Sequence, residues 1–122
     1  MASTIPSLLY AAREKGLSQI DSRLETQPDS LDLLIAKAHF LTELGRPEEA
    51  KAIYLKAVTL APTSLDVLHN FGKLLYDNRY MSAARTIYTQ AIACHPDNPI
   101  SYTCLANVFY QCQELEDRKS VV

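Results

Sequence analysis

Three prolines, Pro28, Pro62 and Pro96, stand 34 residues apart, and the residues between them recur at the same interval. Apolar, small and aromatic positions all take part in this recurrence. The recurring sets are Leu34, Leu68 and Tyr102; Ala38, Gly72 and Ala106; Leu41, Leu75 and Phe109; Ala50 and Ala84; Ile53 and Ile87; Tyr54 and Tyr88; Ala57 and Ala91; and Val58 and Ile92. A fixed interval of this length indicates stacked structural units, none of which buries its apolar face alone.

Each interval is expected to hold two helices. Within the first of each pair the recurring apolar residues are spaced by three and four, which predicts one buried stripe per helix. These stripes are Leu34, Ala38 and Leu41; Leu68, Gly72 and Leu75; and Tyr102, Ala106 and Phe109. Asp29 with Ser30, and Thr63 with Ser64, are suited to cap helices that begin near Leu31 and Leu65, and Asn98 with Pro99 begins a third.

The break between the paired helices is clearest at Gly45 and Pro47. Glycine adopts the left-handed conformation that ends a helix without a Cβ penalty, and proline is tolerated in the first turn of the next. Glu48 and Glu49 then lie in that first turn, where the helix dipole favours negative charge.

Two helices in 34 residues, a small residue in the middle of the first, an alanine–tyrosine–alanine pattern in the second and a closing proline resemble the tetratricopeptide repeat. The resemblance covers two complete repeats and a further first helix, up to about residue 111. It implies an all-α, right-handed solenoid of helical hairpins in a single domain, residues 1–122. The expected divisions are a degenerate capping repeat over 1–30, repeats over 31–64 and 65–98, and an incomplete repeat over 99–122.

The two ends follow the pattern less closely. Ser7–Lys15 is expected to form a preceding helix, followed by a short apolar stripe of Leu17, Ile20 and Leu24. Gly16 and Arg23 replace the packing alanines there. At the other end, residues 114–122 are expected to begin a second helix, with Arg118 at the packing-alanine position.

The resemblance implies a concave groove lined by the first helices, in which family members hold an extended peptide or a helix of another protein. The groove positions, carried over one by one, are Asp32, Ile35, His39, Asp66, His69, Asn70, Lys73, Ile100, Thr103, Cys104 and Asn107, with Tyr76 and Tyr110 near the rim. Their mixture of charged, amide and apolar groups suits a peptide better than a ligand of one charge. The alternative is that they form solvated helix faces. The predicted partner contacts are Ile35, His39, Asp66, His69, Asn70, Lys73, Ile100, Thr103 and Asn107.

Some family members bind the C-terminal carboxylate of heat-shock chaperones through a clamp of lysines, asparagines and an arginine. Only Asn70 matches that clamp here, so this activity is not expected. Asn70 also resembles an asparagine with which some relatives hold a peptide backbone.

Charge and composition exclude several classes of ligand. The net charge is -2, and the sequence has no basic stripe, so neither nucleic acid nor an anionic membrane surface is an expected partner. No apolar run is long enough to insert into a bilayer, and the first residues do not resemble a secretory signal. The 3 cysteines, without a C-x-x-C pair, favour reduced thiols and a cytoplasmic location.

Catalysis, metals and cofactors are not predicted. The sequence has no glycine-rich phosphate loop, no G-x-S-x-G and no H-E-x-x-H. His39, His69 and Cys104 are candidate metal ligands but lack close spacing and a fourth partner.

The sequence therefore predicts a non-catalytic module for protein–protein interaction. Two alternatives stay open: the recruiting N-terminal part of a larger enzyme, such as a repeat-containing glycosyltransferase, and a scaffold that self-associates weakly through its incomplete last repeat. The apolar residues that suggest the scaffold are Phe109, Leu115, Val121 and Val122.

Overall fold

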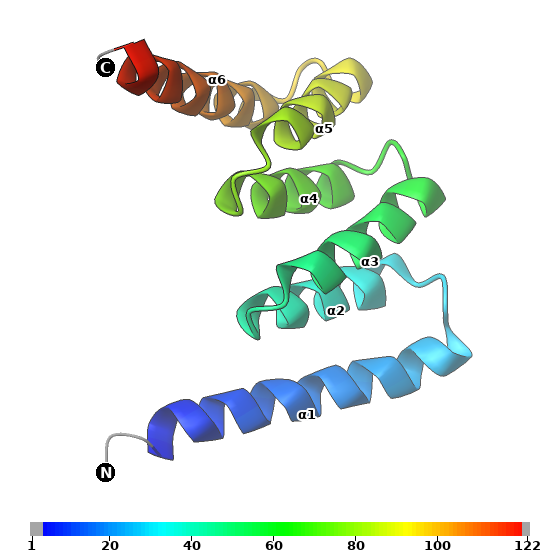
Figure 1. Cartoon of the computed structure of the whole chain (residues 1–122). Helices are drawn as coiled ribbons and strands as arrows, with labels where there is room; N and C mark the ends of the chain where they lie inside the picture. Colours follow the sequence, from blue (N-terminus) through cyan, green and yellow to red (C-terminus); the bar gives the residue numbers. More distant parts are fainter. Residues whose placement is uncertain (1–3, 121–122) are drawn as a thin grey trace. The chain divides into compact units, whose positions relative to one another are not determined.

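The structure, a computed structural model, describes residues 4–120, with side-chain surroundings for residues 7–113 (Figure 1). Across residues 4–120 it contains helices α1 to α6 and no strand, which confirms the predicted all-α helical repeat fold. The chain divides between Pro62 and Thr63 into two compact units, and each has its own core. The finer division into repeats stays a prediction.

Unit 1 consists of α1 (Thr4–Thr26), α2 (Leu31–Glu43) and α3 (Pro47–Leu60), with α2 packed against both neighbours. The predicted stripe of α2 is buried, as is the alanine–tyrosine–alanine pattern of α3. These core residues are Leu34, Ala38, Leu41, Ala50, Tyr54 and Ala57. Small residues let the two helices approach closely, and the tyrosine ring fills the space beside them.

The turn between α2 and α3 has the predicted chemistry. Gly45 has a φ of 75°, and the backbone N–H of Arg46 donates to the carbonyl of Leu41 at 2.8 Å, which closes the end of the helix. Pro47 occupies the first turn of α3, and the Arg46 guanidinium pairs with the carboxylate of Glu49. That contact, the largest cause, raises the pKa of Arg46.

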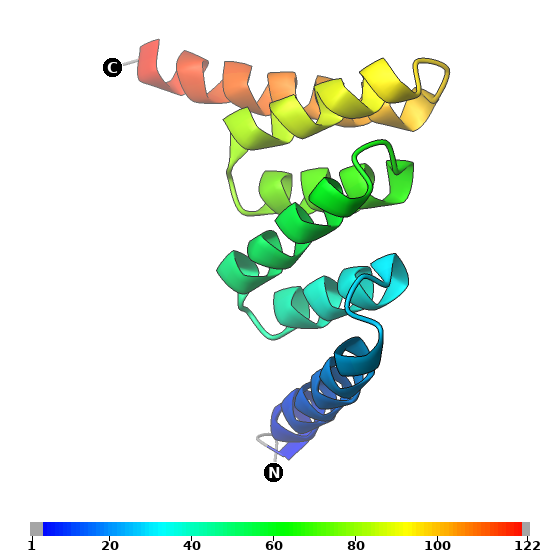
Figure 2. The ribbon, with the colours of Figure 1, turned by 90° about the vertical axis from the view of Figure 1, so that its right-hand side faces the viewer.

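Unit 2 consists of α4 (Leu65–Asp77), α5 (Met81–Cys94) and α6 (Pro99–Ser120). Here α5 packs against both α4 and α6, and α5 and α6 lie side by side in both views (Figures 1 and 2). The core repeats the pattern of unit 1 and adds three apolar residues of α4. The buried residues of α4 and α5 are Val67, Leu68, Phe71, Gly72, Leu74, Leu75, Met81, Ala84, Tyr88 and Ala91.

Serine and asparagine side chains begin three of the helices, as predicted. The hydroxyl oxygens of Ser30 and Ser64 accept from the backbone N–H of Leu33 and Val67, and Asn98 Oδ1 accepts from the N–H of Ile100 at 2.9 Å. These bonds satisfy backbone donors that have no partner inside the helix.

The predicted stripe of α6 is wrong. Tyr102 and Phe109 are 48% and 49% exposed, and Ala106 is also exposed, whereas Ser101 and Val108 are fully buried. The reason is that α5 packs against the face of α6 that carries Ser101 and Val108. The stripe equivalent to those of α2 and α4 therefore points away from the core of unit 2.

The expected helix breaks near both ends are also wrong. Residues 4–26 form one continuous helix instead of stopping near Lys15, although Leu17 is buried and Ile20 and Leu24 are half-buried as predicted. A Cβ at Gly16 would lie 2.8 Å from the ring of Phe40, so this glycine lets α2 approach α1. A glycine inside a helix costs only about 1 kcal/mol relative to alanine, which a long helix tolerates.

At the other end, α6 continues to Ser120, where a turn followed by a second helix was expected. The equivalent turns in the earlier repeats use left-handed residues, Gly45 and Arg79, with φ values of 75° and 69°. Gln113 stands at the corresponding position of α6 and stays helical. The two earlier turns contain residues that favour an end of the helix, Gly45 with Pro47 and Asn78, whose side-chain amide donates to the carbonyl oxygen of Leu74 at 2.8 Å. Residues 111–115 contain no glycine, proline or asparagine, so the helix does not stop there. The side chain of Arg118 lies outside the described residues.

Candidate functional site

A hollow of about 390 Å³ opens on the surface of unit 2. Helix α4 supplies most of its wall, α6 supplies the opposite side, and α5 contributes one ring. The lining residues are His69, Asn70, Lys73, Tyr76, Asp77, Tyr88, Ile100, Cys104 and Asn107.

A histidine–serine bond joins α4 to α6 beside this hollow. His69 Nε2 lies 2.6 Å from Ser101 Oγ, and the His69 ring meets the edge of the Tyr88 ring with centroids 6.4 Å apart. Ser101 has no exposed surface. A buried hydroxyl needs a hydrogen-bond partner, and His69 supplies it. The pair therefore fixes where α6 stands relative to α4.

Sequence reasoning missed Ser101. One signal was present: the corresponding positions of the two preceding intervals are Leu33 and Val67, so Ser101 is a hydroxyl at an apolar repeat position. A polar group at such a position indicates a buried partner.

Burial favours the uncharged forms of two inner side chains of the hollow, His69 and Tyr88. It lowers the pKa of His69, although the negative charge of Asp66 partly opposes the shift. Burial also raises the pKa of Tyr88 well above its ordinary value, and a hydrogen bond with Cys104 adds to that effect. At neutral pH the inner wall therefore offers a neutral imidazole and a phenol.

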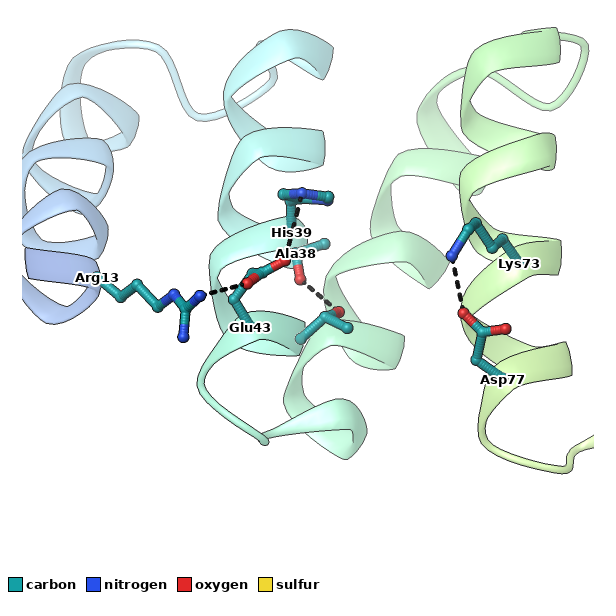
Figure 3. A network of polar contacts seen from close by, with 7 residues as sticks. Arg13, Ala38, His39, Glu43, Lys73 and Asp77 are labelled. Atoms are coloured by element: carbon teal, nitrogen blue, oxygen red, sulfur yellow. Dashed lines mark hydrogen bonds and ion pairs between the residues drawn. The ribbon is translucent and has the colours of Figure 1, made fainter. Parts of the chain in front are cut away.

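Charge is confined to the rim, where Lys73 Nζ lies 2.9 Å from Asp77 Oδ2 (Figure 3). Both side chains are at least half exposed, so this pair contributes little to stability and is open to exchange with a ligand. Nearby, Asn70 Nδ2 donates to the backbone oxygen of Asp66 at 2.7 Å, which holds the amide against its own helix.

Five of the predicted partner contacts lie around the hollow: His69, Asn70, Lys73, Ile100 and Asn107. Tyr76 and Cys104, which were expected at the groove or its rim, line it too. Asp66 and Thr103 belong to the same two helices but do not line it. The Thr103 hydroxyl donates to the carbonyl oxygen of Pro99 at 3.2 Å.

The remaining predicted residues, Ile35 and His39, belong to α2 in unit 1. Ile35 is half-buried, and His39 is exposed with its Nε2 3.9 Å from Glu43 Oε1. Glu43 also pairs with Arg13 of α1 at 2.9 Å (Figure 3). This polar cluster ties α1 to α2 within unit 1.

The geometry of the His69–Ser101 pair does not suit catalysis, because a fully buried hydroxyl cannot reach a substrate. Within the described residues, no three His, Cys, Asp or Glu side chains gather closely enough to hold a metal ion. Across the same part of the chain, no helix is long and apolar enough to cross a membrane.

Sequence models of the tetratricopeptide repeat match residues 31–64 and residues 87–119. The first match covers α2 and α3 with the loop that follows. The second begins within α5 and ends in α6, so it joins a second helix to the first helix that follows it. No curated protein matches the chain in sequence.

Several solved structures share the fold. A thermophilic TPR protein of Thermus thermophilus superposes with a TM-score of 0.74 at 18% identity, over 80% of this chain and 50% of that one. Naa15/Naa10 bound to HypK-THB superposes with a TM-score of 0.68 at 25% identity, over 93% of this chain and 17% of that one. The first TPR of Spaghetti (RPAP3), bound to the HSP90 peptide SRMEEVD, superposes with a TM-score of 0.73 at 12% identity, over 92% of this chain and 89% of that one.

The present chain thus spans half the length of the Thermus protein and a smaller part of Naa15/Naa10. Three observations indicate the same family: helices are paired at a fixed interval, small residues lie where they cross, and two segments match the repeat. The chain belongs to the tetratricopeptide repeat family, whose members serve as protein-interaction modules.

Proposed function

We propose that the chain is a non-catalytic module that binds a segment of a partner protein, and that this segment docks in the hollow of unit 2. The observation that carries the proposal is the lining of the hollow. Two amides, an aliphatic side chain and an ion pair surround one concavity that is large enough for one or two peptide side chains.

The lining matches what a peptide presents. Asn70 and Asn107 each offer an amide, which pairs with the N–H and C=O of a peptide bond. Ile100, 58% exposed, and the ring of Tyr76 offer apolar surface for one side chain of the ligand. The rim pair of Lys73 and Asp77 adds one group of each sign, so the site favours no strongly charged ligand.

The Spaghetti (RPAP3) structure adds support for peptide binding as a class, since that domain holds a peptide and shares this fold. Its ligand ends in an acidic residue and carries two further carboxylates. The hollow here has a single lysine, already paired with Asp77. We therefore propose a ligand other than an acidic C-terminus.

The test begins with peptides selected from a random library on the immobilised chain. Calorimetry then compares the wild type with the double variant Asn70→Ala and Lys73→Ala. We expect the selected peptides to bind the variant at least about tenfold more weakly, because both substitutions remove groups that face the ligand. Helical content and melting temperature should stay nearly unchanged, since the hydrogen bond of Asn70 and the ion pair of Lys73 are both formed within α4.

A matched control places two alanines on an exposed face of α1, through Lys15→Ala and Gln19→Ala. This control should bind like the wild type. Equal affinity of the wild type and the hollow variant would contradict the assignment of the hollow.

We also propose a reducing compartment such as the cytoplasm, because Cys94, Cys104 and Cys112 are free thiols. The possibility that the chain recruits partners for a larger enzyme stays a prediction, and the sequence of the complete gene would test it.

A further inference from the structure

We propose that two copies of this chain associate weakly through the outward face of α6, with the two helices antiparallel about Ala106. The face consists of Tyr102, Ala106, Phe109 and Tyr110. It lies on a different side of α6 from Ile100, Cys104 and Asn107, which line the hollow. The inference therefore does not depend on the proposed peptide site.

The first observation is the exposure of aromatic surface. Tyr102, Phe109 and Tyr110 are 48%, 49% and 61% exposed. At the equivalent positions of the earlier first helices, Leu34 with Ala38 and Leu68 with Gly72, a following helix covers the stripe completely. In both earlier cases the structure that covers this face is a helix.

Neighbouring groups hold the aromatic rings in place. The Tyr102 hydroxyl donates to the carbonyl oxygen of Pro96 at 2.9 Å, and the Arg85 guanidinium lies over the Phe109 ring, 5.6 Å from its centroid. Rings that are already fixed lose little conformational entropy when a partner covers them.

The second observation is the absence of charge. From Pro99 to Gln113 the sequence contains no Asp, Glu, Lys, Arg or His. The first helices α2 and α4 each carry charged residues on their exposed surface, among them Asp32, Glu43, Asp66 and Lys73. A depletion of charge with an enrichment of aromatic residues is the composition of an interface core.

The third observation selects a second copy as the occupant. Tyr102 and Tyr110 stand four residues before and after Ala106, so one helical turn separates each ring from the alanine. In an antiparallel pair with its two-fold axis at Ala106, Tyr102 of one helix faces Tyr110 of the other, and the small side chains at the axis allow close approach. The side chains of α6 that form the face carry no charge, and the Arg85 cation beside them lies over the Phe109 ring, so the two helices themselves meet without like-charge repulsion.

The size of the face sets the strength of the association. Pro99–Gln113 is about 22 Å long at 1.5 Å per residue. One helix face of this length buries on the order of a few hundred Å² per chain, below the roughly 800 Å² of a standard interface. We therefore expect a dimer with a dissociation constant on the order of 100 µM.

The test uses sedimentation equilibrium of the full chain up to about 1 mM. Ala106→Arg should abolish the dimer, because it places two like charges at the axis. The matched control Ala93→Arg adds the same charge to the exposed surface of α5 and should leave the dimer intact. Circular dichroism should show equal helical content in all three proteins.

The proposed register has its own test by charge pairing. Tyr102→Lys and Tyr110→Glu should each weaken self-association about tenfold. An equimolar mixture of these two variants should restore it, because the new lysine of one chain would face the new glutamate of the other while the second tyrosine pair is intact. A mixture of Tyr102→Lys with Tyr110→Lys should stay monomeric.

Several results would overturn the proposal: a wild type that is monomeric at about 1 mM, a dimer that survives Ala106→Arg, or equal behaviour of the two mixtures. A monomeric wild type would leave the face to a helix of another protein. The surface expected from the sequence shared only Phe109 with this face. The side chain of Leu115, and Val121 and Val122, lie outside the described residues.

Discussion

At the scale of single residues, the contact between Gly72 and Tyr88 sets how closely α4 and α5 approach. A Cβ on Gly72 would overlap the Tyr88 ring, with its Cζ only 2.6 Å away. Tyr88 is only 3% exposed, so its ring has little room to move aside. We predict that Gly72→Ala lowers the free energy of unfolding by about 1–3 kcal/mol, measured by urea denaturation.

The direction of this effect is informative because an exposed helical Gly→Ala change normally stabilises by about 1 kcal/mol. In a Tyr88→Leu background the ring is absent, and the same substitution should become neutral or stabilising. A penalty that is equal in both backgrounds would show that the ring is not its cause.

His69 gives unit 2 a pH-dependent stability. Its pKa in the folded chain lies below the ordinary value of 6.5, because burial penalises the imidazolium. The unfolded chain therefore binds the proton more readily than the folded chain does. The stability that neutral His69 contributes is fully present above about pH 6.5 and is lost as the pH falls toward the lower folded pKa.

The measurement compares melting temperatures at about pH 7.5 and about pH 5.5. His69→Gln keeps a side chain able to hydrogen-bond Ser101 but does not titrate. We expect the melting temperature of the wild type to fall more than that of His69→Gln over this interval. An equal fall in the melting temperature of the two proteins would assign the pH dependence to groups other than His69.

At the scale of helices, hydrophobic spacing predicted α2 to α5 because each has a neighbour that covers its apolar face. For α6 the same spacing predicted a buried stripe that is in fact exposed. Tyr102, Ala106 and Phe109 keep the repeat register, but the register of one helix carries no information about whether another helix covers it. The sequence signal that distinguishes α6 is the missing charge between Pro99 and Gln113.

Helix ends were predictable where a special residue marks them. Ser30, Ser64 and Gly45 did so, whereas Gly16 resembled a break and proved to be a close contact with Phe40. For the candidate site, groove positions taken from the repeat pattern included six residues of the hollow. Ser101 escaped because its hydrogen bond to His69 joins residues far apart in sequence.

The cap of α4 offers a prediction at this scale. Ser64→Ala removes the oxygen that accepts from the backbone N–H of Val67, and it should lower the free energy of unfolding by about 1 kcal/mol. Ser64→Asp retains an acceptor at the helix N-terminus and should leave stability nearly unchanged. Chemical denaturation measures the free energy of unfolding of both variants. An equal decrease in the two variants would argue against a capping role for Ser64.

At the scale of the whole molecule, each unit has a separate core built on the same repeated positions. Leu34 and Leu68 occupy corresponding places, and both are almost fully buried. Truncating either to alanine removes a buried side chain and leaves a cavity, which should cost about 2–5 kcal/mol. Because each leucine packs within the core of its own unit, the damage should concentrate in that unit.

Hydrogen exchange of backbone amides, read by mass spectrometry, separates the two units. Leu34→Ala should accelerate exchange mainly in residues 4–62, and Leu68→Ala mainly in residues 63–120. Leu55→Ala is the control, because Leu55 is 51% exposed and its truncation should change exchange little. Uniform acceleration along the chain in both core variants would mean that the units unfold as one cooperative body, and the separate cores would then not act as separate units of stability.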